Sequence, residues 1–332
     1  MQALELLAIS AYDSAVYENA EPQLTRSIRD SSSNSVKAAA IHCLSSCALF
    51  GGAGEDDIYG QMTFFMDIVA SDGQSIDAND DPESVTAAIR EWGLLATEMD
   101  DLEAESEEAV QVFADQLNSD NAAVQIAAGE NIALLYEKSY SEQEDYDDQN
   151  PDEENKEEGL EDVDEEEEVE EEGGVRLIKR YDAYHNTSEI LHDLHSLATI
   201  HSKRISKKEK KTLHNSFLSI LTTVEDPRHG PMYNTAIDQD TGHHYGSRAM
   251  VKLGDGAMNI DRWWKWIWLS SLRRILRGGF SVHYHQGNRA VLDYLPVVMH
   301  LNVAAMQNDR VGARKAMKAR SNARGFAIHH EE

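Results

Sequence analysis

The sequence predicts an all-α protein in which an N-terminal array of repeated helices precedes a smaller, mainly helical C-terminal domain. Apolar residues recur at helical spacing in three similar segments of the first half, and an acidic low-complexity stretch separates these segments from a basic second half. We therefore expect four regions: a helical array at 1–141, a disordered acidic linker at 142–174, a helical domain at 175–306 and a basic helix or tail at 307–332.

The three similar segments span 30–50, 80–96 and 120–136, and each runs from a polar turn through small residues to a large apolar one. The matching positions are Val36, Ala39, Ala40 and Leu44, then Val85, Ala88 and Trp92, then Val124, Ala127, Ala128 and Ile132. The 39 residues from Val85 to Val124 are close to the period of armadillo and HEAT repeats. We expect an armadillo/HEAT-like superhelix whose inner face is lined by small residues.

Local signals mark where helices of this array begin. Asp80-Asp81-Pro82-Glu83 predicts a helix start, with proline and carboxylates in the first turn. Residues 1–12 already read as an amphipathic helix that lacks a capping residue. Because solenoids end in atypical capping repeats, we expect further repeats upstream of residue 1.

Charge is distributed unevenly along the chain. Residues 1–141 have a net charge of −21, residues 142–172 of −19 and residues 173–332 of +10. We expect six acidic residues between the helices of the array. They either lie in solvated loops or form a groove that binds basic protein tails. They are Asp100, Asp101, Glu103, Glu105, Glu107 and Glu108.

The stretch from 142 to 172 contains twenty acidic residues and one basic residue. Such a composition repels itself and cannot offset the entropy of ordering, so we expect disorder. The linker is either a passive spacer or a shield that competes with RNA for the basic half.

Two basic segments of the second half are expected to contact phosphate. The first follows a helix over 189–201 and opens a second helix, with Ser206 and Glu209 as a capping box. The second is near the C-terminus and places its bases on one side of a thin helix; a disordered basic tail is the alternative. The residues are Lys203, Arg204, Lys207, Lys208, Lys210, Lys211, Arg310, Arg314, Lys315, Lys318, Arg320 and Arg324. For the first segment, a solvated face or a localisation signal is the alternative.

A tryptophan cluster lies between these segments. We expect a helix capped by Asp261 and ended by Gly278 and Gly279. Since this helix is apolar nearly all round, its tryptophans are expected in the core, with base stacking as the alternative. They are Trp263, Trp264, Trp266 and Trp268.

The sequence contains no phosphate-binding loop and no nucleophile elbow, so we expect neither enzymatic activity nor a cofactor. His192 and His195 share a helix face but have no cysteine or carboxylate cluster beside them, and no metal site is expected. Cys43 and Cys47 are expected as buried reduced thiols. We expect no membrane partner, no small-molecule substrate, and a cytoplasmic protein with the nucleus as a second location.

Several of these segments resemble the interferon-related developmental regulator family. They are 31–52, 122–137, 202–225, the helix around Trp263, and the closing basic motif at 314–326. The resemblance implies an armadillo-like superhelix, a family-specific C-terminal domain and no catalytic activity. It also implies a regulator of gene expression, acting through ribosome binding that represses translation or through co-regulator complexes in the nucleus. The tryptophan cluster departs from the family pattern.

From the residues and the resemblance we favour binding to ribosomes and rRNA through the basic half, with the acidic superhelix as a protein-binding scaffold. A nuclear transcriptional co-regulator acting by protein–protein recruitment is the alternative.

Overall fold

The computed structural model describes residues 1–11, 13–142, 177–199, 207–233, 249–253, 256–292, 294–295 and 299–300. The first-half helices are α1 (Gln2–Ala11), α2 (Ser14–Asp30), α3 (Asn34–Phe50), α4 (Glu55–Ala70), α5 (Pro82–Ala96), α6 (Glu103–Gln116) and α7 (Ala122–Lys138), with the short turn η1 (Gln74–Ile76) before α5. They are followed by β1 (Tyr140–Glu142), β2 (Leu177–Lys179), α8 (Thr187–Ala198) and α9 (Lys207–Glu225). The remaining elements are β3 (Met250–Leu253), β4 (Gly256–Asn259), α10 (Trp263–Leu276), η2 (Arg277–Gly279), α11 (Phe280–His285), α12 (Arg289–Leu292) and β5 (Met299–His300).

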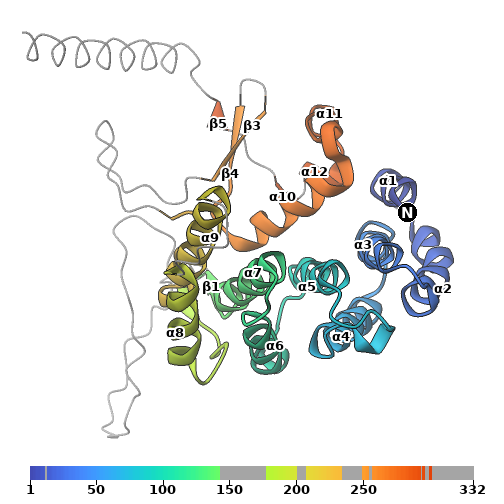
Figure 1. The fold of residues 1–332 in the computed structure, drawn as a ribbon. Helices are drawn as coiled ribbons and strands as arrows, with labels where there is room; N and C mark the ends of the chain where they lie inside the picture. Colours follow the sequence, from blue (N-terminus) through green and yellow to red (C-terminus); the bar gives the residue numbers. More distant parts are fainter. Residues whose placement is uncertain are drawn as a thin grey trace, which may run out of the picture.

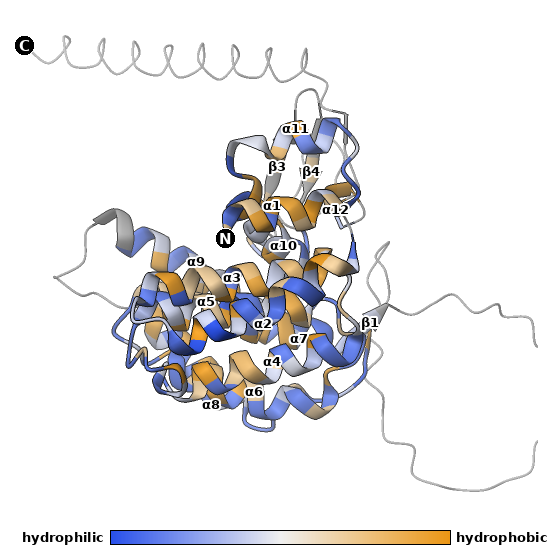
Figure 2. Cartoon of the chain, turned by 90° about the vertical axis from the view of Figure 1, so that its right-hand side faces the viewer, coloured by the Kyte–Doolittle hydropathy of each residue, from blue (hydrophilic) through white to orange (hydrophobic). Residues whose placement is uncertain are grey.

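The first nine helices form the predicted superhelix. Helices α2 and α3, α4 and α5, α6 and α7, and α8 and α9 pack as consecutive hairpins. Figure 1 shows α1, α3, α5, α7 and α9 in one curved row, with α2, α4, α6 and α8 on its outer side. Figure 2 shows hydrophobic and hydrophilic residues alternating along these helices, as amphipathic packing requires.

The predicted start of α5 and most of the apolar stripe are confirmed. Asp81 caps α5 by accepting a hydrogen bond from the Ser84 backbone N–H at 2.8 Å. The stripe residues of α5 and α7 are all buried. In α3 the expected inward position of Val36 is wrong, because Val36 is 39% exposed and Lys37 is buried in its place. The Lys37 ammonium donates to the backbone carbonyl of Ile76, which satisfies its charge away from water.

Close packing between inner helices depends on small residues. At Gly93 on α5, a side chain would collide with Asn131 of α7, whose amide donates to the Ile89 carbonyl at 2.7 Å. At Gly129 on α7, a side chain would meet Ile220 of α9. The row of inner helices therefore continues without a gap from α5 to α9.

Helices α8 and α9 form the fourth hairpin of the superhelix, although the predicted division assigns them to the C-terminal domain. The antiparallel pair β1–β2 brings the chain back to α7, and Tyr184 donates to the Gln111 side chain of α6 at 2.5 Å. Buried apolar residues from both halves belong to one contiguous core. Independent folding of the predicted domains stays a prediction.

Helix α10 lies along the curved inner row and packs against α1, α5 and α7 (Figure 1). Its first turn is capped by Glu137 of α7, which accepts hydrogen bonds from the backbone N–H groups of Trp263 at 2.7 Å and Trp264 at 3.2 Å. The prediction that Asp261 caps this helix is wrong, because Asp261 pairs with Lys265 at 2.6 Å.

The other end of α10 also differs from expectation. The helix ends at Leu276, and the residue that breaks it is Arg277, with a positive φ of 49°. Gly278 and Gly279 follow in the η2 turn, so they come after the break instead of causing it. Arg273 and Arg274 occupy the last turn, where the helix dipole favours positive charge.

A small antiparallel sheet precedes and follows α10. Strands β3 and β4 form a hairpin, and β5 pairs with the free side of β4. The hairpin was not among the predicted elements, although Gly254-Asp255 between two short apolar runs is a turn signal. Val251, Met258 and Ile260 are buried. Among the described residues, no helix has the length and apolar character needed to cross a membrane.

Candidate nucleic-acid interface

A groove of about 340 Å³ runs between α10 and the inner helices α5 and α7. Helix α10 contributes one tryptophan, one isoleucine and several polar residues to the groove, and α5 and α7 contribute mainly charged and polar residues that lie beside their apolar stripes. The lining residues are Arg90, Glu91, Ile126, Ala127, Glu130, Asn131, Trp266, Ile267, Ser270, Ser271, Arg273 and Arg274.

Arginines from two helices lie on the rim of this groove. Arg90 of α5 and Arg273 of α10 are both exposed, and so is Arg277, one turn beyond Arg273. None of these three forms an ion pair with another residue that the structure describes. The groove therefore offers uncommitted positive charge.

Trp266 forms the aromatic wall of the groove and is only half-buried. Its indole Nε1–H donates to Glu130 Oε1 at 2.9 Å, which fixes the orientation of the ring. Burial raises the pKa of Glu130, and the Trp266 hydrogen bond and the Arg90 charge offset this only in part. The same ring also lines a more apolar cavity of about 270 Å³ between α9 and α10.

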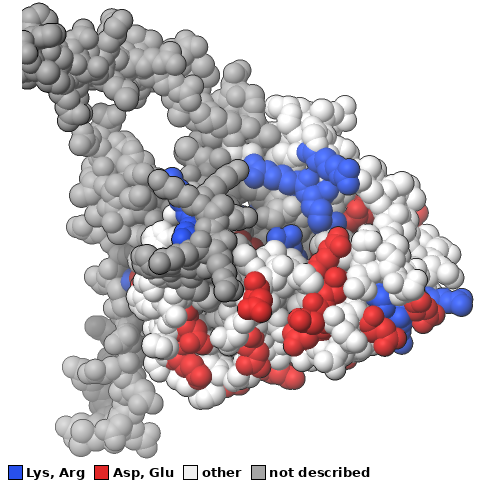
Figure 3. Space-filling view, in the orientation of Figure 1, with Lys and Arg blue, Asp and Glu red and all other residues white. Residues whose placement is uncertain are grey.

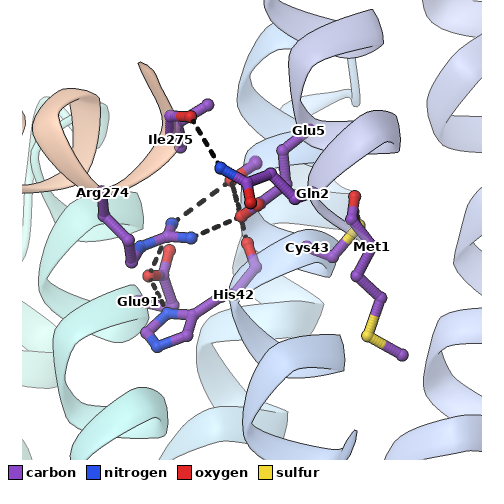
Figure 4. A network of polar contacts seen from close by, with 9 residues as sticks. Met1, Gln2, Glu5, His42, Cys43, Glu91, Arg274 and Ile275 are labelled. Atoms are coloured by element: carbon purple, nitrogen blue, oxygen red, sulfur yellow. Dashed lines mark hydrogen bonds and ion pairs between the residues drawn. The ribbon is translucent and has the colours of Figure 1, made fainter. Parts of the chain in front are cut away.

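A buried polar network holds α10 in place beneath the rim (Figure 4). The Arg274 guanidinium reaches Glu91 Oε1 of α5 at 3.1 Å and also pairs with Glu5 of α1. His42 Nδ1 lies 2.5 Å from the same Glu91 oxygen. Burial alone would raise the pKa of Glu91, but the charges of Arg274 and His42 outweigh it, and the pKa is lowered. Glu91 is therefore an ionised anchor for α10.

The structure locates only part of the predicted phosphate-binding set. Lys207, Lys208, Lys210 and Lys211 lie in the first turns of α9, where Lys211 is exposed and Lys210 half-buried. The other predicted residues lie outside the described part of the chain: Lys203, Arg204, Arg310, Arg314, Lys315, Lys318, Arg320 and Arg324, as do the Ser206 cap and all of the predicted linker except Glu142, which ends strand β1.

The four tryptophans divide into two pairs. Trp263 and Trp268 are buried, Trp263 with its Nε1–H donated to the Thr223 hydroxyl at 2.7 Å, and Trp268 stacked on Tyr294. Trp264 and Trp266 are half-buried against the core. Only Trp266 lines the groove.

Sequence reasoning did not single out Arg90, which is isolated in an apolar repeat. No local pattern reveals that it shares a groove with Arg273, because the two residues belong to helices far apart in the chain. The sequence offers only a weak indication of the groove arginines, namely a basic last turn on a helix that is otherwise apolar.

The acidic residues of the superhelix lie mostly away from α10. Figure 3 shows positive side chains gathered near α10 and negative ones spread over the helices below it. The expectation that Glu103, Glu105, Glu107 and Glu108 lie between helices is wrong, because they form the first turns of α6. Carboxylates at a helix N-terminus are stabilised by the dipole. Asp100 and Asp101 lie before the helix, where Asp101 contacts Arg180.

The cysteines and the potential metal-ligating side chains can be located within the described residues. Cys43 and Cys47 are buried and free, as predicted. No group of three or more potential metal-ligating side chains gathers in the described ranges. His195 lies instead 3.6 Å from Glu225.

Comparison with known proteins agrees with this architecture. Residues 1–225 match the family "Interferon-related developmental regulator (IFRD)", and the match ends at the last residue of α9, where the superhelix ends. The chain is 27% identical over 259 residues to an uncharacterized protein of Schizosaccharomyces pombe (strain 972 / ATCC 24843), covering 77% of this chain and 50% of that protein. It thus spans about half the length of that relative. The chain belongs to the interferon-related developmental regulator family, a family of non-catalytic regulators.

Proposed function

We propose that this protein is a non-enzymatic regulator of gene expression that binds ribosomes through rRNA and represses translation. The separation of charge supports the proposal most directly: a net +10 in residues 173–332 against −21 in residues 1–141. In a protein of this kind the basic region attracts the phosphate backbone, whereas the acidic scaffold repels it. The superhelix serves as the scaffold that presents the basic elements and binds protein partners.

The proposed RNA contacts are the two basic segments at 203–211 and 310–324. The uncommitted arginines beside α10 are consistent with a polyanion partner, since guanidinium groups match phosphate geometry and bind it bidentately. With ribosomes as the proposed partner, the proposed location is the cytoplasm, with the nucleus as a second location.

Sedimentation through a sucrose gradient tests the proposal. The native protein is expected in ribosomal fractions, and substituting Arg314→Glu, Lys318→Glu and Arg320→Glu together should move it to the top of the gradient. Substituting Arg26→Glu and Arg29→Glu in α2, a change of four charge units against six, is the control for a loss of positive charge elsewhere on the chain. Sedimentation of the unmodified protein only in free fractions would refute ribosome binding.

A nuclear co-regulator that recruits proteins is the second candidate, and the acidic surface favours it. A cavity of about 610 Å³ between the loops before α5 and α7 is lined by four aspartates, Asp72, Asp80, Asp115 and Asp120, which suits a basic protein segment. Co-fractionation with chromatin in place of ribosomes would support this function.

A further inference from the structure

The groove beside α10 combines three properties that single-stranded RNA requires of a binding site. It has an aromatic wall, Trp266; it has unpaired guanidinium groups on its rim, Arg90 and Arg273; and it has polar floor groups from Asn131 and Ser271. A base can stack on an aromatic ring of this kind while adjacent phosphates bind arginine.

The charges on the rim are set apart from the other basic residues of α10. Lys265 pairs with Asp261, and Arg274 is held by Glu5 and Glu91, so both are committed to the fold. Arg273 and Arg277 are exposed one helical turn apart and have no ion-pair partner among the described residues. Arg90 faces the same groove from the opposite wall. Arg90 acts on the nearby Glu130 carboxyl, whereas Arg273 and Arg277 have no ion pair among the described residues, and this excess of positive charge on the rim favours an anionic ligand.

The groove is also held rigid, which lowers the entropic cost of binding. Glu137 caps one end of α10, and the Arg274 network fixes the other end to α1 and α5. The Glu130 hydrogen bond orients the Trp266 ring between the two cavities.

We propose that this groove binds single-stranded RNA, with one base against Trp266 and the flanking phosphates on Arg90, Arg273 and Arg277. The inference rests on the proposed function and adds to it a contact surface on the superhelix, separate from the two basic segments. An acidic peptide would satisfy the arginines but would leave the aromatic wall without a stacking partner.

Binding of a fluorescein-labelled single-stranded oligouridylate to the full chain, followed by fluorescence anisotropy over a range of salt concentrations, tests this site. Substituting Arg273→Glu with Arg277→Glu should weaken binding at least tenfold. It should also flatten the slope of log affinity against log salt by about 1.4, from the roughly 0.7 that each single-strand phosphate contact contributes. The control is Arg26→Glu with Arg29→Glu on the outer helix α2, which changes net charge equally.

A second pair of variants separates stacking from charge. Trp266→Ala should lower affinity about 5- to 150-fold, the equivalent of the roughly 1–3 kcal/mol of one base–aromatic stack, and leave the salt slope unchanged. Because Trp266→Ala could disturb folding, Ser270→Trp is the companion variant: Ser270 is exposed in the groove, so a bulky side chain there blocks the site without changing charge. Thermal unfolding checks both variants.

Photocrosslinking with 4-thiouridine in the oligonucleotide should label α10 at or beside Trp266. Unchanged affinity in the arginine and Ser270 variants, while Arg314→Glu, Lys318→Glu and Arg320→Glu together abolish binding, would overturn the groove site and leave the proposed function intact. Absence of RNA binding by the unmodified chain would overturn the proposed function itself. Displacement of the RNA by polyglutamate without any crosslink at α10 would identify an acidic-peptide site instead.

Discussion

The ends of helices α5 and α10 find their hydrogen-bond and ion-pair partners in opposite ways. The first turn of α5 is capped by Asp81, whose carboxylate accepts a hydrogen bond from the backbone N–H of Ser84, three residues later. The first turn of α10 is capped by Glu137, 126 residues earlier in the chain, and its last turn is anchored by Glu5 of α1. Helix α5 is therefore specified locally, whereas the ends of α10 are satisfied only when it is docked on the superhelix.

The strongest test of this difference is removal of the Arg274 guanidinium. Arg274→Ala leaves Glu5 buried without its counter-charge and Glu91 with His42 as its remaining partner, and is expected to cost about 3–5 kcal/mol of unfolding free energy. Arg273→Ala, one residue away and exposed, should change it by less than about 0.5 kcal/mol. Chemical denaturation measures both. Equal losses would mean that α10 is not held by this network.

Packing gives the next contrast, between two tryptophans of the same helix. Trp268→Ala removes a fully buried ring that contacts Phe50 and stacks on Tyr294, at an expected cost of about 3–5 kcal/mol. Trp264→Ala removes a half-buried ring and should cost about 1–2 kcal/mol. Melting temperatures of the two variants check the order. The reverse order would place Trp264 in the core.

Capping compares α5 and α10 directly. Asp81→Ala should cost about 1 kcal/mol through loss of one cap. Glu137→Ala should cost about 1–2 kcal/mol because two backbone N–H groups lose their acceptor. Hydrogen exchange should rise in the first turn of α5 for the former and along α10 for the latter. Exchange that stays confined to the first turn of α10 would show that this helix does not depend on docking.

The pH dependence of stability has a defined sign. Burial raises the pKa of Glu137 from its ordinary 4.5 to about 7, against the opposing hydrogen bonds from Trp263 and Trp264. The folded state therefore holds a proton that the unfolded state has released between these two values, and stability falls as pH rises from about 4.5 to about 7. Glu137→Gln should flatten this part of the profile. An unchanged slope would assign it to another carboxyl group.

Cleavage of the linker is expected to have the smallest effect on the association of the two halves. From its composition, the linker should be cleaved first, between 142 and 174, in limited proteolysis. Because α9 packs on α7 and α10 on α5, we expect the two fragments to co-elute on gel filtration after cleavage. Separation of the fragments would support two independent domains.

Prediction from the sequence succeeds where the signal is local. The repeat of Ala and large apolar residues reveals the superhelix, and Asp81-Pro82 locates the start of α5. It fails where a partner comes from far away: nothing near Trp263 indicates that Glu137 caps it, and Asp261 is the better local candidate. The groove arginines show the same limit, since Arg90 and Arg273 line one groove only because α10 packs against α5. In α3, Lys37 replaces Val36 inside because carbonyl groups of other segments surround it.

The position of α10 also changes what the superhelix can offer to other molecules. A helix tethered to the same chain competes for the curved inner row at an effective concentration on the order of millimolar, without any loss of translational freedom. A separate peptide that binds the same face must displace α10, so its affinity and concentration must together outweigh the effective concentration of α10. Protein partners of the superhelix are therefore expected at its outer helices and loop edges, away from the face that α10 covers.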